Sequence, residues 1–271
     1  MTEETNEHRI AVIGLGKLGG ILLRAFLDNG LVLPENVRAT VHREENADLR
    51  AALFGVQVST DNLSAVEDAD LVLLCVKPAA VRAVCEQIAP VIDHKLVISV
   101  AASVPTSLIE EPFDEVPVVR AMSGTPAAVG AAMTGLCAGT NATDEHLALA
   151  RALFDAVGRT VILDEKHMDA VTGLSASGPA FIYVIIESLA EAGVKVGLPR
   201  DVATTLAAQA TLGAAGMVLD TGNHPALLKD EVTTPAGCTI DGLLELEDGG
   251  LRVTLIKAVV KATERAGELK D

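Results

Sequence analysis

The chain has 271 residues, enough for one or two domains, and its formal net charge is -16 at pH 7. So acidic a chain lacks the basic face that nucleic acid or an anionic membrane would need, and neither is expected as a partner. The hydrophobic fraction of 49% and the mean hydropathy of +0.38 are high for a soluble protein. The excess of apolar surface predicts self-association or an all-helical buried region.

Cysteine and histidine usage indicates neither disulfide bonds nor a metal. The four cysteines lack CxxC spacing, and the six histidines contain no pair at helical i, i+4 spacing. The N-terminal stretch MTEETNEHR is polar and acidic, unlike the basic start and apolar core of a signal peptide. A reducing cytoplasm is therefore the expected location.

The first half of the chain reads as alternating strands and helices. Residues 9–13 form an apolar strand, followed by a glycine turn and a helical pattern that ends near Gly30. VRATVH predicts a second strand, and a helix is expected from about Ala79. Further apolar strands are expected at 70–76, 95–101, 116–122, 133–139 and 160–165. This alternation is typical of an α/β fold with a mostly parallel sheet and helices on both faces.

Beyond residue 165 the pattern changes to long helical periodicities separated by SGP, GLP, GNHP and TTPAG. We therefore expect two domains, an α/β domain at 8–164 and an all-α domain at 165–271. The most apolar stretch, 180–190, follows Pro179 and is interrupted by Glu187, well short of a membrane span of about 20 residues. It is predicted to be a buried helix. The apolar helices between about 170 and 219 are expected to pack against a second chain.

A glycine motif opens the first predicted helix. GLGKLG matches GxGxxG, and it follows a strand and begins a helix. In this context small residues let the backbone approach the pyrophosphate of a dinucleotide at the helix N-terminus. The alternative is a purely structural turn. The motif predicts a Rossmann-type NAD(P)-binding domain, with contacts from Gly14, Gly16, Lys17, Leu18 and Gly19.

The end of the second strand bears on the choice of cofactor. NAD-binding folds usually carry an acidic residue there, and this chain has His42 and Arg43. An arginine can pair with a 2′-phosphate, which favours NADPH, although the acidic pair at 44–45 keeps NADH possible. The alternative is an exposed loop arginine with no role. Asn62 is expected to hydrogen-bond the same ribose or phosphate, or else to be a turn residue before a helix.

Two further strand ends complete the expected cofactor site. The segment Val76, Lys77 and Pro78 closes one strand, and Ala101 with Ala102 closes the next. Ligands of open α/β sheets bind at the carboxyl ends of strands, and small residues there leave room for a nicotinamide and its ribose. We expect the backbone of Lys77 to contribute more to cofactor binding than its ammonium group. The alternative is that this ammonium is only a solvated loop charge.

The segment VTTPAGCTID, residues 232–241, places threonines and a glycine in front of a helical pattern. Backbone N–H groups at a helix start, together with hydroxyls, suit an anion such as a carboxylate. The alternative is a turn with a simple N-cap.

Several motifs together resemble the pyrroline-5-carboxylate reductase family, above all LSASGPAF and VTTPAGCTI, with VIGLGKLG, VKP, SVAASV, GLPRDVA, AAQATLGAA and LEDGGLR. The resemblance runs essentially from end to end. It implies reduction of 1-pyrroline-5-carboxylate to L-proline with NAD(P)H, and a helical domain that interlocks into a dimer, often assembled further into a ring such as a decamer. It also implies that Thr234, Gly237, Cys238 and Thr239 bind substrate, with Thr239 catalytic through a hydrogen bond to the ring nitrogen.

Two positions depart from the family pattern. Ala236 stands where two adjacent glycines are common, which narrows the backbone conformations available. Gly124 stands where the family often has an asparagine. The alternatives are another imine reductase or a β-hydroxyacid dehydrogenase on the same architecture, or a cofactor-binding paralogue without turnover. A hydroxyacid dehydrogenase would need a catalytic lysine, and the stretch DAVTGLSASGPAF contains none.

Overall fold

The computed structural model describes residues 8–269, so most of the polar N-terminal stretch noted above lies outside the described residues. The chain divides into two compact units. The first contains the residues up to Ser177 together with those from Lys261 onward, and the second contains Gly178–Val260.

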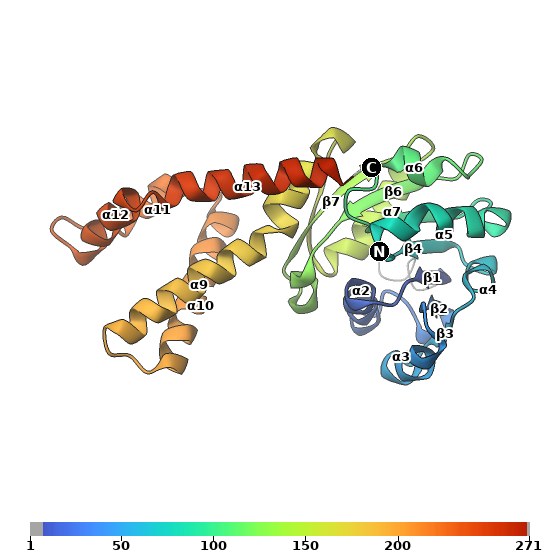
Figure 1. Cartoon of the computed structure of the whole chain (residues 1–271), viewed down its shortest axis with the longest axis horizontal. Coiled ribbons are helices and arrows are strands. Elements are labelled where there is room, and N and C mark those ends of the chain that lie inside the picture. Colours follow the sequence, from blue (N-terminus) through green and yellow to red (C-terminus); the bar gives the residue numbers. More distant parts are fainter. Residues whose placement is uncertain (1–7, 270–271) are drawn as a thin grey trace. The chain divides into compact units, whose positions relative to one another are not determined.

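The first unit is built on one sheet of eight strands with the order β3-β2-β1-β4-β5-β6-β7-β8 (Figure 1). All neighbouring strands pair in parallel except β6 and β7, which are antiparallel. The strands are β1 Ile10–Ile13, β2 Val37–Thr40, β3 Gln57–Ser59, β4 Leu71–Leu74, β5 Leu96–Ser99, β6 Val118–Met122, β7 Ala132–Ala138 and β8 Gly158–Ile162. The expected α/β fold with a mostly parallel sheet is confirmed.

The helices of this unit cover both faces of the sheet. They are α2 Lys17–Asp28, α3 Ala47–Phe54, α4 Asn62–Glu67, α5 Val81–Ile88, α6 Thr106–Glu110, α7 Asp144–Asp155 and α8 Met168–Val171. Helices α2, α3 and α7 share one apolar core, and α4, α5 and α6 share the other. Strand β1 alternates between them, since Ile10 and Val12 enter the first core and Ala11 and Ile13 the second. Its unbroken apolar sequence thus follows from burial on both faces.

The second unit consists of helices joined by short loops, with no strand among its described residues. Its helices are α9 Gly178–Lys195, α10 Arg200–Thr221, α11 Pro225–Glu231 and α12 Cys238–Asp248, and α13 Leu251–Glu268 begins here. Helices α9 and α10 pack side by side through Ala190, Ala203 and Ala207 (Figure 1). A Cβ at Gly193 would lie 2.8 Å from that of Ala203, so a glycine permits this close approach.

The prediction of a buried helix at 180–190 is wrong for the single chain. Within α9, the described residues include one buried position, Ala190. Tyr183 is 62% exposed and Val184 61% exposed, and α10 similarly exposes Leu212 at 65%. By length and composition alone, residues 165–195 and 200–221 could each cross a membrane. The fully buried part of the contact between α9 and α10 consists of alanines, with Ile186 and Val194 partly buried against it, so large side chains such as Tyr183 and Leu212 remain exposed.

Candidate active site

The sheet brings the predicted cofactor segments to one edge. Strands β2, β1, β4 and β5 are neighbours and run parallel, so the segments that follow them meet at their carboxyl ends. The glycine turn follows β1, Arg43 follows β2, Lys77 follows β4 and Ala101 follows β5. Chain order reverses between β1 and β4, which is where open α/β sheets bind dinucleotides.

The glycine turn is shaped by close backbone packing. Gly14 has φ +94°, and a Cβ there would lie 2.9 Å from Cγ1 of Val76. The N–H of Leu15 donates to the carbonyl oxygen of Thr40 at 2.7 Å, which ties the turn to β2. Gly16 is the N-cap of α2. Because glycine has no side chain, Gly16 gives the N–H groups of the first helical turn no side-chain hydrogen bond. Such groups suit an anion.

Cys75 lies directly behind this turn. A Cβ at Gly19 would be 2.9 Å from the Cβ of Cys75, so the thiol-bearing residue and the helix are in contact. Burial raises the pKa of the Cys75 thiol to about 12. The thiol is therefore neutral at physiological pH, and Cys75 serves packing rather than nucleophilic chemistry.

Arg43 is held only at the surface. Its side chain is 71% exposed, and its Nη1 lies 3.4 Å from Oε1 of the equally exposed Glu45. An exposed ion pair of this kind contributes about 0–1 kcal/mol, so the guanidinium can exchange it for a more highly charged anion. Glu44 instead accepts a hydrogen bond from the hydroxyl of Thr60 at 2.9 Å. His42, beside Arg43, is exposed.

Asn62 begins α4 and does not cap it. The cap is Asp61, whose side chain accepts from the N–H of Ser64. The side-chain amide of Asn62 donates to Oε1 of Gln87 at 2.8 Å, across to α5. Asn62 thus has a partner within the protein, and its contact with a cofactor stays a prediction.

A cavity of about 550 Å³ runs along α2 beside the glycine turn. It shares Gly16 and Lys17 with the predicted cofactor residues. The rest of its lining comes from the outer side of α2 and from neighbouring segments, including Arg24, Arg50 and Phe54. Among the described residues, Arg43, Lys77 and Ala101 do not line this cavity, so it is a groove beside the predicted strand-end site and not that site itself.

The segment after β5 has an unusual backbone. Ala101 is buried, and its N–H donates to the hydroxyl of Ser99 at 3.3 Å. Ser103 is 1% exposed and has φ 62°, in the left-handed region that residues other than glycine rarely adopt. Such outliers persist only where the surrounding structure holds them.

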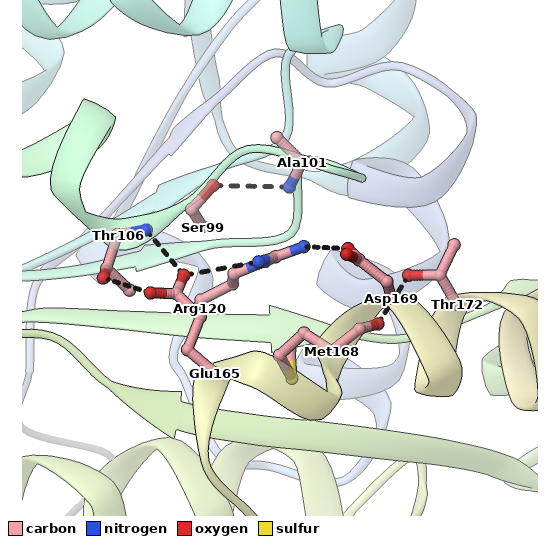
Figure 2. Close-up of polar contacts among 8 residues, drawn as sticks. All are labelled: Ser99, Ala101, Thr106, Arg120, Glu165, Met168, Asp169 and Thr172. Atoms are coloured by element: carbon pink, nitrogen blue, oxygen red, sulfur yellow. Dashed lines mark hydrogen bonds and ion pairs between the residues drawn. The ribbon is translucent and has the colours of Figure 1, made fainter. Parts of the chain in front are cut away.

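A buried polar cluster lies next to this segment, and sequence reasoning missed it (Figure 2). Arg120 on β6 is 1% exposed, and its Nη1 lies 3.3 Å from Oε1 of Glu165. Its Nη2 lies 4.0 Å from Oδ1 of Asp169. Glu165 also accepts two hydrogen bonds from Thr106, from its N–H at 2.7 Å and from its hydroxyl at 2.8 Å. The signal in the sequence was a single arginine inside the apolar strand VPVVRAM.

The same cluster affects a neighbouring thiol. Cys137 on β7 stands opposite Arg120 in the strand register. Burial, and next the charge of Glu165, raise the pKa of Cys137 to about 12, while Arg120 acts in the opposite direction. Cys137 is therefore a neutral, packed side chain.

A π-helical turn follows α8. It spans Thr172–Ala176 and ends with a bond from the N–H of Ser177 to the carbonyl oxygen of Thr172 at 2.9 Å. Turns of this kind are frequent at functional sites. Sequence reasoning used the overlapping LSASGPAF only as a family signature. A Cβ at Gly124 would lie 3.8 Å from the Cα of Ala176, so the position of the missing asparagine lies close to this turn.

The predicted substrate loop belongs to the second unit. Helix α12 begins at Cys238 with Gly237 as its N-cap, and Thr239 is the second helical residue. The N-cap of α12 is therefore Gly237 and not Thr239. Because Gly237 has no side chain, the first-turn N–H groups of α12 are uncapped from that position, as an anion site requires.

The turn before α12 is tight. The N–H of Gly237 donates to the carbonyl oxygen of Thr234 at 3.0 Å. Ala236 has φ 57°, so the residue that departs from the family pattern adopts the left-handed conformation that favours glycine. Cys238 carries a free, exposed thiol.

Known proteins resemble the two halves of the chain separately and the whole chain together. A family model described as pyrroline-5-carboxylate reductase dimerisation matches residues 165–269, and one described as NADP oxidoreductase, coenzyme F420-dependent, matches residues 9–103. The pyrroline-5-carboxylate reductase of Methanosarcina acetivorans is 46% identical over 264 residues, which cover 96% of this chain and 97% of the relative. That of Arabidopsis thaliana is 43% identical, over 97% of this chain and 96% of the relative.

Solved structures agree over the same length. The pyrroline-5-carboxylate reductase of Coxiella burnetii has a TM-score of 0.90 at 35% identity and covers 98% of this chain and 100% of its own. The Plasmodium falciparum pyrroline carboxylate reductase, solved with NADP bound, has a TM-score of 0.89 at 28% identity, with the same coverage. From this similarity over nearly its full length, the chain belongs to the pyrroline-5-carboxylate reductase family.

Proposed function

We propose that this chain reduces 1-pyrroline-5-carboxylate to L-proline with NADPH as the hydride donor. The observation that carries the proposal is the 46% identity to a pyrroline-5-carboxylate reductase over 96% of the chain. The protein is an NAD(P)H-dependent oxidoreductase that acts on a C=N bond. The reaction is the last step of proline biosynthesis. The choice of NADPH over NADH rests on Arg43.

The residues at the strand ends fit a dinucleotide. The uncapped start of α2 and the glycine turn would hold the pyrophosphate, and a Cβ at Gly16 would have no heavy atom of residues 8–269 within 4 Å apart from its chain neighbours. Arg43 and Asn62 would meet the adenosine end. Val76, Lys77 and Pro78, with Ala101 and Ala102, would line the nicotinamide end. When bound, the reduced nicotinamide supplies the hydride.

The loop before α12 would hold the substrate. Its first-turn N–H groups and the Thr234 hydroxyl suit the substrate carboxylate, and Gly237 lets the chain approach it. A protonated cyclic imine already has an electrophilic carbon, so the protein mainly orients it. The Thr239 hydroxyl would hydrogen-bond the ring nitrogen. Cys238 fills space beside it, since the imine needs no nucleophile.

We place the boundary between the cofactor domain, 8–164, and the helical dimerisation domain, 165–271, at residue 165. The family model for dimerisation begins there, which supports this choice. The uncovered side chains of α9 and α10 support a dimer, since an apolar surface this large is rare on a monomer. Dimers would assemble further into a ring such as a decamer. Light scattering at micromolar concentration measures the assembly, and a stable, active monomer would contradict it.

The proposed location is the cytoplasm. All four cysteines are free thiols, which suits a reducing compartment. A second chain packed on α9 and α10 would bury the same apolar surface that a membrane would. The net charge of -16 opposes binding to anionic lipid.

A steady-state assay tests the function. Purified protein is given 1-pyrroline-5-carboxylate and NADPH, and NADPH oxidation and proline formation are followed together. We expect the two to proceed in equal amounts. Oxidation of a β-hydroxyacid with NADP+, or reduction of an unrelated imine with NADPH, in place of this reaction would support the alternative enzymes. Cofactor binding without turnover would identify a non-catalytic paralogue.

A further inference from the structure

The segment that carries Ala101 and Ala102 is fastened at both ends (Figure 2). At its start, the hydroxyl of Ser99 accepts a hydrogen bond from the N–H of Ala101 at 3.3 Å. At its end, Thr106 donates its N–H and its hydroxyl to Glu165, at 2.7 Å and 2.8 Å. Between these points Ser103 adopts φ 62°. A backbone held in this conformation needs support from its neighbours.

Glu165 provides an anchor that the local sequence does not. The residue before α6 is Pro105, which has no side-chain donor or acceptor to cap the helix. Glu165, 59 residues later in the chain, takes the N–H of Thr106 instead. One carboxylate oxygen of Glu165 accepts from the N–H of Thr106 and the other accepts from its hydroxyl. These two hydrogen bonds fix the orientation of both the backbone and the side chain of Thr106.

Arg120 sets the position of Glu165 in turn. Its side chain is 1% exposed, and its Nη1 lies 3.3 Å from Oε1 of Glu165. Strand register places Arg120 opposite Ser99, the residue that fastens the start of the segment. Ser99, Arg120 and Glu165 thus tie both ends of residues 99–106 to the rigid sheet. If Glu165 lost its negative charge, the positive charge of the buried Arg120 would be less well neutralised.

We propose that Glu165 is a positioning residue for hydride transfer. By holding Thr106 it fixes the segment 100–105, and with it the backbone of Ala101 and Ala102. The inference rests on the proposed function, since it assumes that the nicotinamide lies against these two alanines. Displacing a bound reactant by even about 1 Å can slow a reaction roughly a hundredfold, so a loose segment should slow transfer more than it weakens binding.

The chain offers a matched control on the same short helix. At the other end of α6, Glu110 accepts from the N–H of Thr140 at 2.6 Å and from its hydroxyl at 3.0 Å. The N–H of Gly139 bonds to Val118, the first residue of β6, so this pair lies at the amino-terminal edge of the parallel strands. Glu110→Gln weakens the same kind of pair away from the cofactor segments, because it removes the charge and one of the two acceptor oxygens.

The first measurement needs no activity. Amide hydrogen exchange is followed in the cofactor-free full chain for the peptide that spans residues 99–106. Glu165→Gln should speed exchange there about tenfold, while Glu110→Gln should leave it unchanged. Equal protection in the wild type and Glu165→Gln overturns the proposal. If Glu165→Gln fails to fold, Thr106→Val, which removes one of the two bonds, should speed exchange about threefold, and no change overturns it.

The second measurement is single-turnover hydride transfer at saturating NADPH and substrate. Glu165→Gln should slow it roughly ten- to a hundredfold, with Kd for NADPH changed about threefold or less. Glu110→Gln should stay within about twofold of wild type. Equal transfer rates in both variants would overturn the positioning role. If the wild type itself does not reduce the imine, the proposed function fails, and hydrogen exchange still decides whether Glu165 holds the segment.

Discussion

Gly19 and Gly14 touch across the start of α2: a Cβ added to Gly19 would lie 2.7 Å from the carbonyl oxygen of Gly14. Real Cβ atoms do not approach backbone oxygen so closely, so the third glycine of the motif is required by the fold. The second glycine differs, because a Cβ at Gly16 would be free of non-neighbouring heavy atoms of residues 8–269 within 4 Å. One motif therefore contains a glycine required by packing and a glycine whose Cβ position is open.

Mutation of Gly19 should affect stability, whereas mutation of Gly16 should affect NADPH binding. Gly19→Ala should lower the free energy of unfolding by about 1–3 kcal/mol, because the backbone must shift to admit the methyl group. Gly16→Ala should leave stability within about 0.5 kcal/mol but raise Kd for NADPH at least about tenfold, because the methyl group occupies the approach of the pyrophosphate. Urea unfolding and NADPH fluorescence titration measure both quantities. Unchanged NADPH binding in Gly16→Ala would refute the assignment of this turn to the cofactor.

Arg43→Ala should raise KM for NADPH about tenfold and leave KM for NADH nearly unchanged, because NADH lacks the 2′-phosphate. The existing partner of Arg43 is the exposed Glu45, so little stability should be lost. Glu45→Gln is the control, and it should hold or lower KM for NADPH by freeing the guanidinium. Steady-state kinetics with both cofactors decides the matter. An unchanged KM for NADPH in Arg43→Ala would remove the basis for the NADPH preference.

Thr239→Val should lower kcat/KM for the imine roughly ten- to a thousandfold, equivalent to about 1.4–4 kcal/mol, while NADPH affinity stays constant. Since Gly237 holds the N-cap position, thermal stability should change little. Thr233→Val is the matched control in the same loop, because the Thr233 hydroxyl already donates to the carbonyl oxygen of Lys229 at 2.7 Å. Equal turnover in Thr239→Val and wild type would exclude a catalytic hydroxyl at this position.

Ala236→Gly should raise the free energy of unfolding by about 0.5–1 kcal/mol. The left-handed backbone costs alanine about 1–2 kcal/mol, and the greater freedom of glycine in the unfolded chain offsets part of the gain. Chemical denaturation measures the difference. A less stable Ala236→Gly protein would contradict the left-handed geometry.

Stability should fall in alkaline solution because of buried thiols. Burial, and next the charge of Glu86, raise the pKa of Cys85 from 9.0 to about 12. The raised folded-state pKa contributes stability that is fully present below about pH 9 and is lost as the pH rises toward 12. Between about pH 8 and about pH 10 this thiol should account for a loss of roughly 1.4 kcal/mol. Urea unfolding of wild type and Cys85→Ala at both pH values checks this, and an equal loss in the two proteins would contradict it.

The amino-acid sequence by itself determined the elements whose signal is local. Apolar runs at β1, β4 and β5 are long enough to mark buried strands, and the glycine turn is recognisable because its residues are adjacent in the chain. The change from alternating elements to uninterrupted helical periodicity marked the all-α half. Strand β3, Gln57–Ser59, could not be predicted from the sequence because it is three residues long and only partly buried. The role of Thr239 in catalysis stays a prediction.

Only the tertiary structure decided which distant residues meet. Arg120 reads as a polar interruption in an apolar strand, and its meaning depends on Glu165, 45 residues away. The antiparallel direction of β7 likewise follows from the path of the chain between Met122 and Ala132, which no local periodicity encodes. Local spacing determines strands, helices and turns because neighbouring residues share one backbone geometry, whereas the partner of a buried charge is selected by packing across the whole sheet.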